Sequence, residues 1–135
     1  MSRSLIQVAN SFNQNVDENG IISPGAIIRR YGCDCQLNGN AITVDGPGYY
    51  AVDASVTVIP TAVGVVTVAL YENGVEVPGA FASTYASTAA QPVAIPIVST
   101  IRRGCNCCNG ISNLTFVLKE GAGVISNFSA RVVKS

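Results

Sequence analysis

Hydrophobic and polar residues alternate along most of this chain. The clearest case is residues 50–58, where apolar side chains take every second position and smaller or more polar ones lie between them. The apolar positions are Tyr50, Val52, Ala54, Val56 and Val58. Because a period of two puts alternate side chains on opposite faces of an extended chain, this segment predicts a half-buried β-strand.

The same period recurs in other segments. It predicts strands at residues 66–70, 93–97, 114–118 and 124–132, with earlier candidates at 5–9, 25–31 and 41–44. In the last strand the predicted apolar face holds Val124, Ser126, Phe128, Ala130 and Val132. Asn73-Gly74 suits a tight hairpin turn, because both residue types tolerate positive φ. No long stretch combines helical spacing with end caps.

Composition supports an all-β domain. The chain has 13 glycines and 6 prolines among many valines and threonines, which favours short antiparallel strands in a sandwich or barrel. Pro60, Pro92 and Pro96 should lie at strand ends or edges, since proline has no N–H to donate to a ladder. Residues 80–91, rich in Ala, Ser and Thr, are predicted as either a weak edge strand or a long loop.

One predicted strand is apolar on both faces. Val65, Ala69 and Tyr71 lie opposite the face that carries Val66 and Leu70. A sheet that is apolar on both sides needs two covers, and packing around a symmetry axis would supply the second. The alternative is an ordinary exposed face with a few apolar residues.

Size and charge narrow the class of protein. The 135 residues fit a single domain. Charged residues make up 12% of the chain, with eight basic and eight acidic side chains. This balance favours self-association and gives no electrostatic footprint for nucleic acid or an anionic membrane. No apolar run is long enough for a signal peptide or a membrane helix, so we expect synthesis in the cytosol and no membrane insertion.

Catalytic patterns are missing from the sequence. The chain has no histidine, which excludes Ser-His-Asp and Cys-His arrangements. Asp17-Glu18 precedes Asn19-Gly20 and fits a solvated turn, while Glu72 and Glu76 flank the predicted hairpin. No glycine-rich phosphate loop is present. We therefore expect a protein without enzymatic activity and without catalytic residues.

All five cysteines lie in two similar segments, IRRYGCDC at residues 28–35 and IRRGCNCC at residues 101–108. They are Cys33, Cys35, Cys105, Cys107 and Cys108. Segments so alike are expected to meet in space. In each Arg-Arg pair, alternation sends the two side chains to opposite faces. We interpret these arginines as strand-edge charges that discourage unwanted pairing, the alternative being contact with an acidic glycan or a partner carboxylate.

Three interpretations of the cysteines stay open. A disulfide between the two clusters would join distant segments and stabilise the fold. Four thiolates could surround a zinc ion, although Cys-x-Cys is tighter than the usual zinc-binding spacing. The thiols could also be free and packed as small apolar side chains. Because the count is odd, at least one cysteine has no partner within the chain.

Three segments resemble a known family in their order and spacing. They are Gly48–Val58, Val66–Gly74 followed by Val77–Ala80, and Ser126–Lys134. Together they resemble the jelly-roll head domains of the tumour necrosis factor (TNF) and complement-globular-head type, especially short bacterial and phage-encoded versions. The chain departs from that family because it lacks the Gly-Asp pair before a late strand, where the cysteine-rich residues 104–110 stand. It also lacks a collagen-like stem.

The resemblance implies an antiparallel jelly-roll sandwich of about ten strands. The domain would occupy residues 21–135, with residues 1–20 as an N-terminal strand or arm. Three copies would form a homotrimer in which one sheet of each protomer faces the threefold axis. Members of this family act by binding, often as adhesive heads on fibres or on virion or spore surfaces.

The resemblance thus implies a non-enzymatic virion surface or fibre head component of a bacteriophage or prophage, located on the virion or outside the cell after release. Expected partners are further copies of the chain, other virion proteins, or a host-surface glycan or protein. The alternatives are a capsid decoration protein without a ligand and a cysteine-based metal module; apart from zinc on the cysteines, no cofactor is expected. Loops carry binding in such folds. The candidate contact residues are Asp34, Asn38, Asn40, Asn106, Asn109 and Asn113.

Overall fold

The computed structural model describes residues 4–32, 34–103 and 112–134. Within these residues the chain forms twelve β-strands and no helix. The strands are β1 (Ser4–Asn10), β2 (Gln14–Val16), β3 (Gly20–Ile22), β4 (Ala26–Tyr31), β5 (Cys35–Asn38), β6 (Ala41–Val44), β7 (Gly48–Pro60), β8 (Gly64–Glu72), β9 (Val75–Ala86), β10 (Val93–Arg103), β11 (Ser112–Glu120) and β12 (Gly123–Lys134). The all-β prediction is confirmed.

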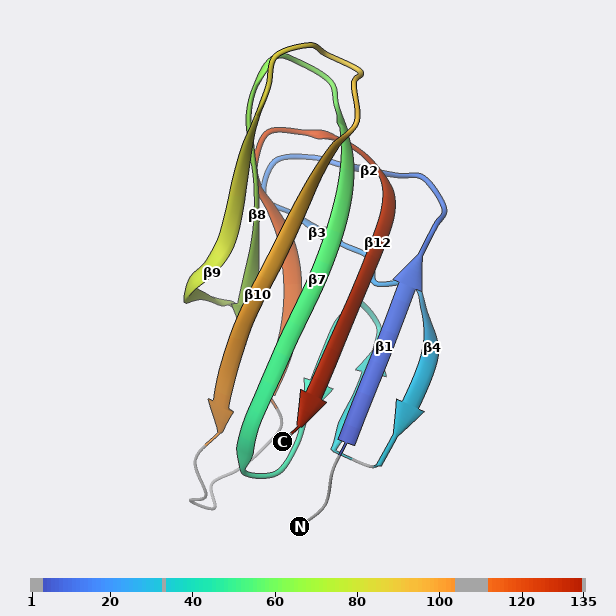
Figure 1. The fold of residues 1–135 in the computed structure, drawn as a ribbon, viewed down its shortest axis with the longest axis vertical. Helices are drawn as coiled ribbons and strands as arrows, with labels where there is room; N and C mark the ends of the chain where they lie inside the picture. Colours follow the sequence, from blue (N-terminus) through green and yellow to red (C-terminus); the bar gives the residue numbers. More distant parts are fainter. Residues whose placement is uncertain (1–3, 33, 104–111, 135) are drawn as a thin grey trace.

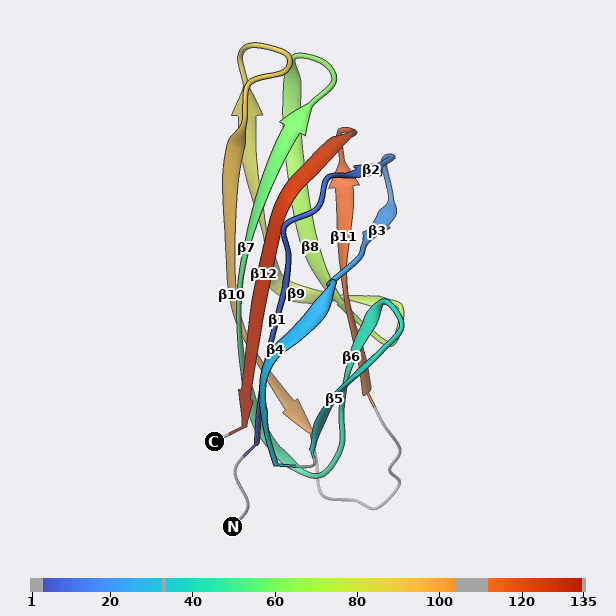
Figure 2. The ribbon, with the colours of Figure 1, turned by 90° about the vertical axis from the view of Figure 1, so that its right-hand side faces the viewer.

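The strands form two antiparallel sheets stacked face to face (Figure 2). Sheet A has the order β10-β7-β12-β1-β4, with the short β2 on β12, and sheet B has the order β5-β6-β11-β8-β9, with β3 on β11. Consecutive strands from β4 onward mostly cross from one sheet to the other, as in a jelly roll. Ser4 pairs with Lys134, so both ends of the described chain lie at one end of the sandwich (Figure 1).

Alternation produces this architecture as the sequence predicts. In β7 every second residue from Tyr50 to Val58 is buried, and the residues between them face outward. The predicted turn at Asn73-Gly74 joins β8 to β9 with positive φ at both residues, 53° and 83°. Pro60 ends β7, and Pro96 lies on the edge strand β10, where a missing N–H is tolerated.

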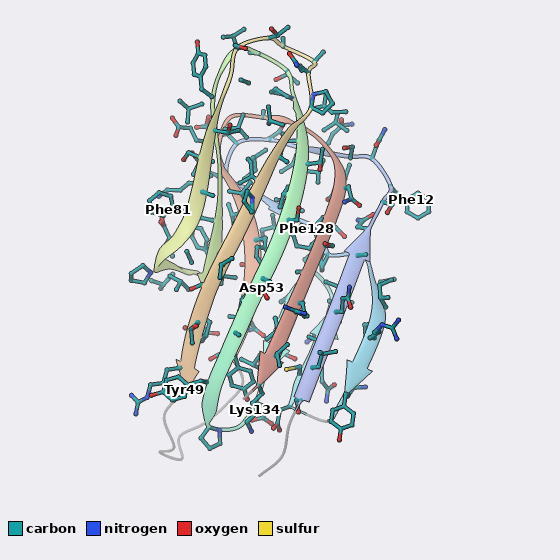
Figure 3. The ribbon with its side chains drawn as sticks, viewed as in Figure 1. Phe12, Tyr49, Asp53, Phe81, Phe128 and Lys134 are labelled. Atoms are coloured by element: carbon teal, nitrogen blue, oxygen red, sulfur yellow. The ribbon has the colours of Figure 1, made fainter. Side chains whose placement is uncertain are left out.

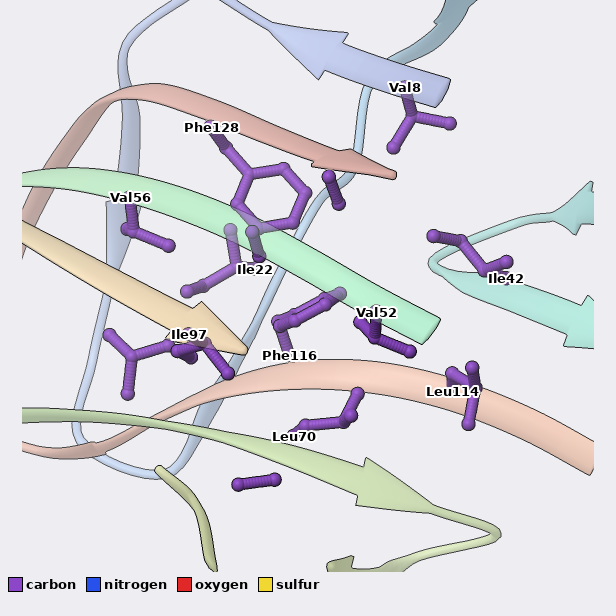
Figure 4. Packing of buried hydrophobic residues seen from close by; sticks show 14 of the residues in the cluster. Val8, Ile22, Ile42, Val52, Val56, Leu70, Ile97, Leu114, Phe116 and Phe128 are labelled. Atoms are coloured by element: carbon purple, nitrogen blue, oxygen red, sulfur yellow. The ribbon is translucent and has the colours of Figure 1, made fainter. Parts of the chain in front are cut away.

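The core lies between the two sheets and is mostly aliphatic, with a pair of aromatic rings at its centre (Figure 4). There Phe116 of sheet B meets Phe128 of sheet A edge to face, with ring centroids 5.1 Å apart. Both rings are buried, and such pairs stabilise a fold beyond the area that they bury. This contact packs sheet A against sheet B in the middle of the core.

One strand prediction needs correction. The predicted inward face of the last strand is wrong at its start, because the register between β12 and β7 shifts between Ile125 and Asn127. This bulge changes the phase, so Ile125 is buried while Val124 and Ser126 are half-buried. Residues 80–91, predicted as an edge strand or a loop, are an edge strand as far as Ala86 and a turn beyond it.

The sequence predicts that another copy of the chain covers the second apolar face of β8. At Ala69 this prediction is wrong, because the single chain already covers that residue. Ala69 pairs with Val117 on β11 and Phe81 on β9, and it is fully buried within the single chain. Val65 on the same face is 42% exposed, and Tyr71 is half-buried. Cross-strand neighbours, which the sequence does not specify, cover the centre of this face.

Candidate functional site

The predicted site residues fall in different parts of the fold. Cys33, Cys105, Cys107, Cys108, Asn106 and Asn109 lie outside the described residues. The described ones are Cys35, Asp34, Asn38, Asn40 and Asn113.

Cys35 opens β5 and is completely buried. Its thiol is free, so the structure does not support a disulfide clasp at this cysteine. Burial first, and then the nearby Asp34 carboxylate, raise the pKa of the thiol from 9.0 to about 11. Metal binding and disulfide exchange need the thiolate, whereas this environment keeps the proton on. Among the described residues, no group of three or more metal-ligating side chains comes together.

An ion pair links two segments at the end of the sandwich where a disulfide between the cysteine clusters was predicted. Asp34 Oδ2 lies 2.6 Å from Lys134 Nζ, and the two side chains are 22% and 11% exposed. The Asp34 backbone N–H also donates to the Ser4 hydroxyl at 3.1 Å. Beside them the Tyr50 hydroxyl lies 2.5 Å from the Asp45 carbonyl oxygen, to which it donates. Asp34 therefore connects the β4–β5 loop to the last strand.

The three candidate asparagines that the structure describes lie in two separate places, the β5–β6 hairpin and the start of β11. Asn38 ends β5, and the exposed Asn40 follows Gly39, whose φ of 62° lets the β5–β6 hairpin turn tightly. Asn113 belongs to β11, where its backbone N–H donates to Asn73 Oδ1 at 2.9 Å. The Asn73 N–H donates in return to the Asn113 carbonyl at 2.8 Å. A role of these side chains in ligand contact stays a prediction.

The outer face of sheet A, in front in Figure 1, is not covered by another element of the described chain. Most of its side chains are small or uncharged. Its exposed or half-buried side chains include Leu5, Ala9, Ala51, Ser55, Thr57, Ala94, Pro96, Val98, Thr100, Ser129 and Val133. Charges on this face of the described strands are Asp53 and Arg131 near its centre, Arg29 on the edge strand β4, and Arg102 near the end of β10.

One row of residues crosses all five long strands of this face. The register places side by side Val98, Asp53, Arg131, Gln7 and Arg29. Arg131 Nη2 lies 2.7 Å from Asp53 Oδ2, with the side chains 53% and 42% exposed, and Asp53 marks the middle of β7 in Figure 3. Around this pair lies a shallow hollow of about 250 Å³, floored by the small side chains of Ser55 and Ser129.

Sequence reasoning missed this row. Alternation alone places Asp53 on the more polar side of its strand, and that signal was present in the sequence. The partner was not, because Asp53 and Arg131 are separated by 78 positions and meet only through the β7–β12 register. Val98 carries no signal beyond being an apolar residue on the face opposite Ile95 and Ile97.

Comparison with known proteins agrees with this architecture. No protein-family model and no curated protein sequence matches the chain. Among solved structures, murine APRIL at pH 5.0 aligns over 99% of this chain and 100% of its own, with a TM-score of 0.74 and 10% identity. The globular domain of zebrafish complement 1qA protein aligns over 93% and 94%, with a TM-score of 0.67 and 9% identity. The fold is a TNF-like jelly roll.

A third similar structure is the vertex protein P5 of PRD1. It aligns with this TNF-like jelly roll over 97% of the chain and 96% of its own length, with a TM-score of 0.62 and 10% identity. At such identities the likeness concerns the path of the chain and not individual site residues. In the part of the chain that the structure describes, no helix is long and apolar enough to cross a bilayer.

Proposed function

We propose that the chain is a non-enzymatic head domain that acts by binding, as a homotrimer, on the surface or fibre of a phage or prophage virion. The TNF-like jelly roll supports the family resemblance, which implies threefold assembly and adhesion. The likeness in fold to a virion vertex protein is in keeping with this setting. The proposed location is the virion, or the exterior of the cell after release.

The outer face of sheet A carries this proposal. Five strands spaced by about 4.8 Å make it about 24 Å wide, and the seven residues of β1 make it about 24 Å long, on the order of 600 Å² in projection. Because side chains protrude from the sheet, the accessible area of this face is larger than its projected area. It is close to the roughly 800 Å² that each partner buries in a standard interface. Depletion of charge is typical of an interface core, and here the central charges already neutralise each other.

Binding by a trimer gains from multivalency. Three copies on one axis turn weak single contacts into useful avidity, provided that the target presents sites at matching distances. With sheet A toward the axis, sheet B and the end loops stay accessible. The β5–β6 hairpin, with the exposed Asn38 and Asn40, is our proposed contact segment, because loops commonly carry recognition.

Light scattering coupled to size exclusion tests the assembly. We expect a particle of three times the 14.0 kDa chain mass, both with and without reductant, because the proposed contact uses sheet A and not cysteine. A chain that stays at its monomer mass at high concentration would overturn the proposal. Binding of the trimer to cells and glycans, compared with an Asn38→Ala/Asn40→Ala variant, then tests adhesion. A trimer that binds neither would be a decoration protein.

A further inference from the structure

We propose that the hollow on sheet A receives the Val98 side chain of a neighbouring copy of the chain. This inference rests on the proposed trimer and identifies the residues that complete its interface. Val98 is 74% exposed on edge strand β10, more than any other large hydrophobic side chain on the described strands of sheet A. The hollow lies on the same face, over β7, β12 and β1, and the middle one of these strands, β12, is two strands from β10.

Symmetry requires two different patches. A contact that closes a threefold ring joins one surface of each copy to another surface of the next. A protruding side chain and a hollow that are separated across one face meet this requirement. Two strand spacings put Val98 about 10 Å from the centre of the hollow, so it cannot fill the hollow of its own chain.

Height along the axis decides which side chain can enter. A threefold rotation about an axis parallel to the strands does not shift a copy along that axis. The Val98 side chain and the hollow that receives it must therefore lie at the same height along the axis. Val98 pairs directly with Asp53, in the row that also holds Arg131 and Gln7 at the hollow. It therefore stands level with its proposed receptor.

The two exposed tyrosines on this face fail the same condition. Tyr49 is four residues from Asp53 along β7, about 13 Å lower, and Figure 3 shows it near the end of the strand. Tyr31 lies two residues beyond Arg29 on β4, about 7 Å from the row. Neither ring stands level with the hollow.

The chemistry of the hollow suits a small aliphatic side chain. The space of about 250 Å³ is several times the roughly 30 Å³ that one water occupies in the liquid. Its lining is mixed: Ser55 and Ser129 offer Cβ atoms beside their hydroxyls, and Gln7 and Arg131 offer methylene stems beside their polar ends. Because Arg131 is already paired with Asp53, the rim has no spare charge to attract a polar group.

The test measures the mass and the dissociation concentration of the full-length chain by light scattering and sedimentation. Val98→Asp should raise the dissociation concentration by about a hundredfold or more, since the new carboxylate would face Asp53 while Arg131 is occupied. Val75→Asp is the matched control, because Val75 is an equally exposed aliphatic residue (69%) on sheet B, and it should leave the trimer intact.

A second pair of variants tests the fit itself. Ser129→Leu fills the hollow from within and should weaken assembly, whereas adding Val98→Ala to it should recover part of the loss. This pair decides the matter if circular dichroism shows that Val98→Asp is unfolded. If the wild-type chain is a trimer and both Val98→Asp and Ser129→Leu dissociate at the same concentration as the wild type, this inference is overturned while the proposed trimer is retained. A monomeric wild-type chain would overturn the trimer as well.

Discussion

Replacing Lys134 by methionine tests what holds together the end of the sandwich that carries both chain ends. The ammonium lies 2.6 Å from the Asp34 carboxylate, and both side chains are mostly buried. Figure 3 labels Lys134 at the end of β12. The ammonium also lies 6.0 Å from the centre of the Tyr50 ring. Methionine keeps most of the stem that passes Gly48 and removes the charge. The variant therefore removes this ammonium from a largely buried carboxylate.

The expected loss follows from the degree of burial. Removing one partner from a fully buried pair costs about 3–5 kcal/mol, whereas exposed pairs contribute about 0–1 kcal/mol. With side chains 11% and 22% exposed, the pair lies between these two limits. We expect Lys134→Met to lower the free energy of unfolding by about 2 kcal/mol, which corresponds to about 6–10 °C in Tm for a domain of this size.

Lys119→Met is the matched control. Lys119 pairs with Glu76 at the same 2.6 Å, but the side chains are 41% and 28% exposed, so its loss should be much smaller. Urea unfolding followed by circular dichroism, with and without reductant, measures both variants. Equal losses in the two variants would refute the burial argument. A Lys134→Met effect that appears only after reduction would show that cysteine chemistry closes this end.

Three further perturbations test other parts of the fold. In the folded chain the pKa of the Cys35 thiol is raised from 9.0 to about 11, so the thiol ionises at lower pH in the unfolded chain. The stability contributed by this thiol should therefore be complete below about pH 9 and decrease toward pH 11. A plot of Tm against pH should show this decrease in the wild type and not in Cys35→Ala. Tyr50→Phe removes the donor to the Asp45 carbonyl and should cost about 1–2 kcal/mol in urea unfolding. Gly25→Ala should cost more than about 1 kcal/mol by the same assay, since φ is 81° and a Cβ would collide with the Ala9 carbonyl; an unchanged midpoint would contradict the backbone geometry.

The period of two predicted most long strands, because burial on one face of a sheet is a local property of the sequence. It failed where geometry is set by the neighbouring strand. The bulge near Ser126 exists only in relation to β7, and the burial of Ala69 depends on Val117 and Phe81 from other strands. The short strands β2, β3 and β5 have too few residues to show a period at all.

The candidate site was harder to predict for a related reason. Cysteine spacing suggested chemistry at one end of the fold, whereas the described cysteine is a protonated core residue and Asp34 belongs to an ion pair. Lys134 has no sequence signal that connects it to Asp34, 100 positions away. Long-range pairs of this kind become visible only when the register of the sheets is known.

The Asp53–Arg131 pair gives the proposed interface its specificity. Half-exposed in the single chain, it contributes little to folding, and an interface of small apolar residues would hold together without it. A neighbour that shifts along the strands, however, would cover these charges and leave the hollow unfilled, so that their loss of water is not offset by the packing of Val98. With Val98 in the adjacent hollow, the charges stay paired within their own chain. We infer that the central row selects one register from the many that a low-charge sheet face would otherwise allow.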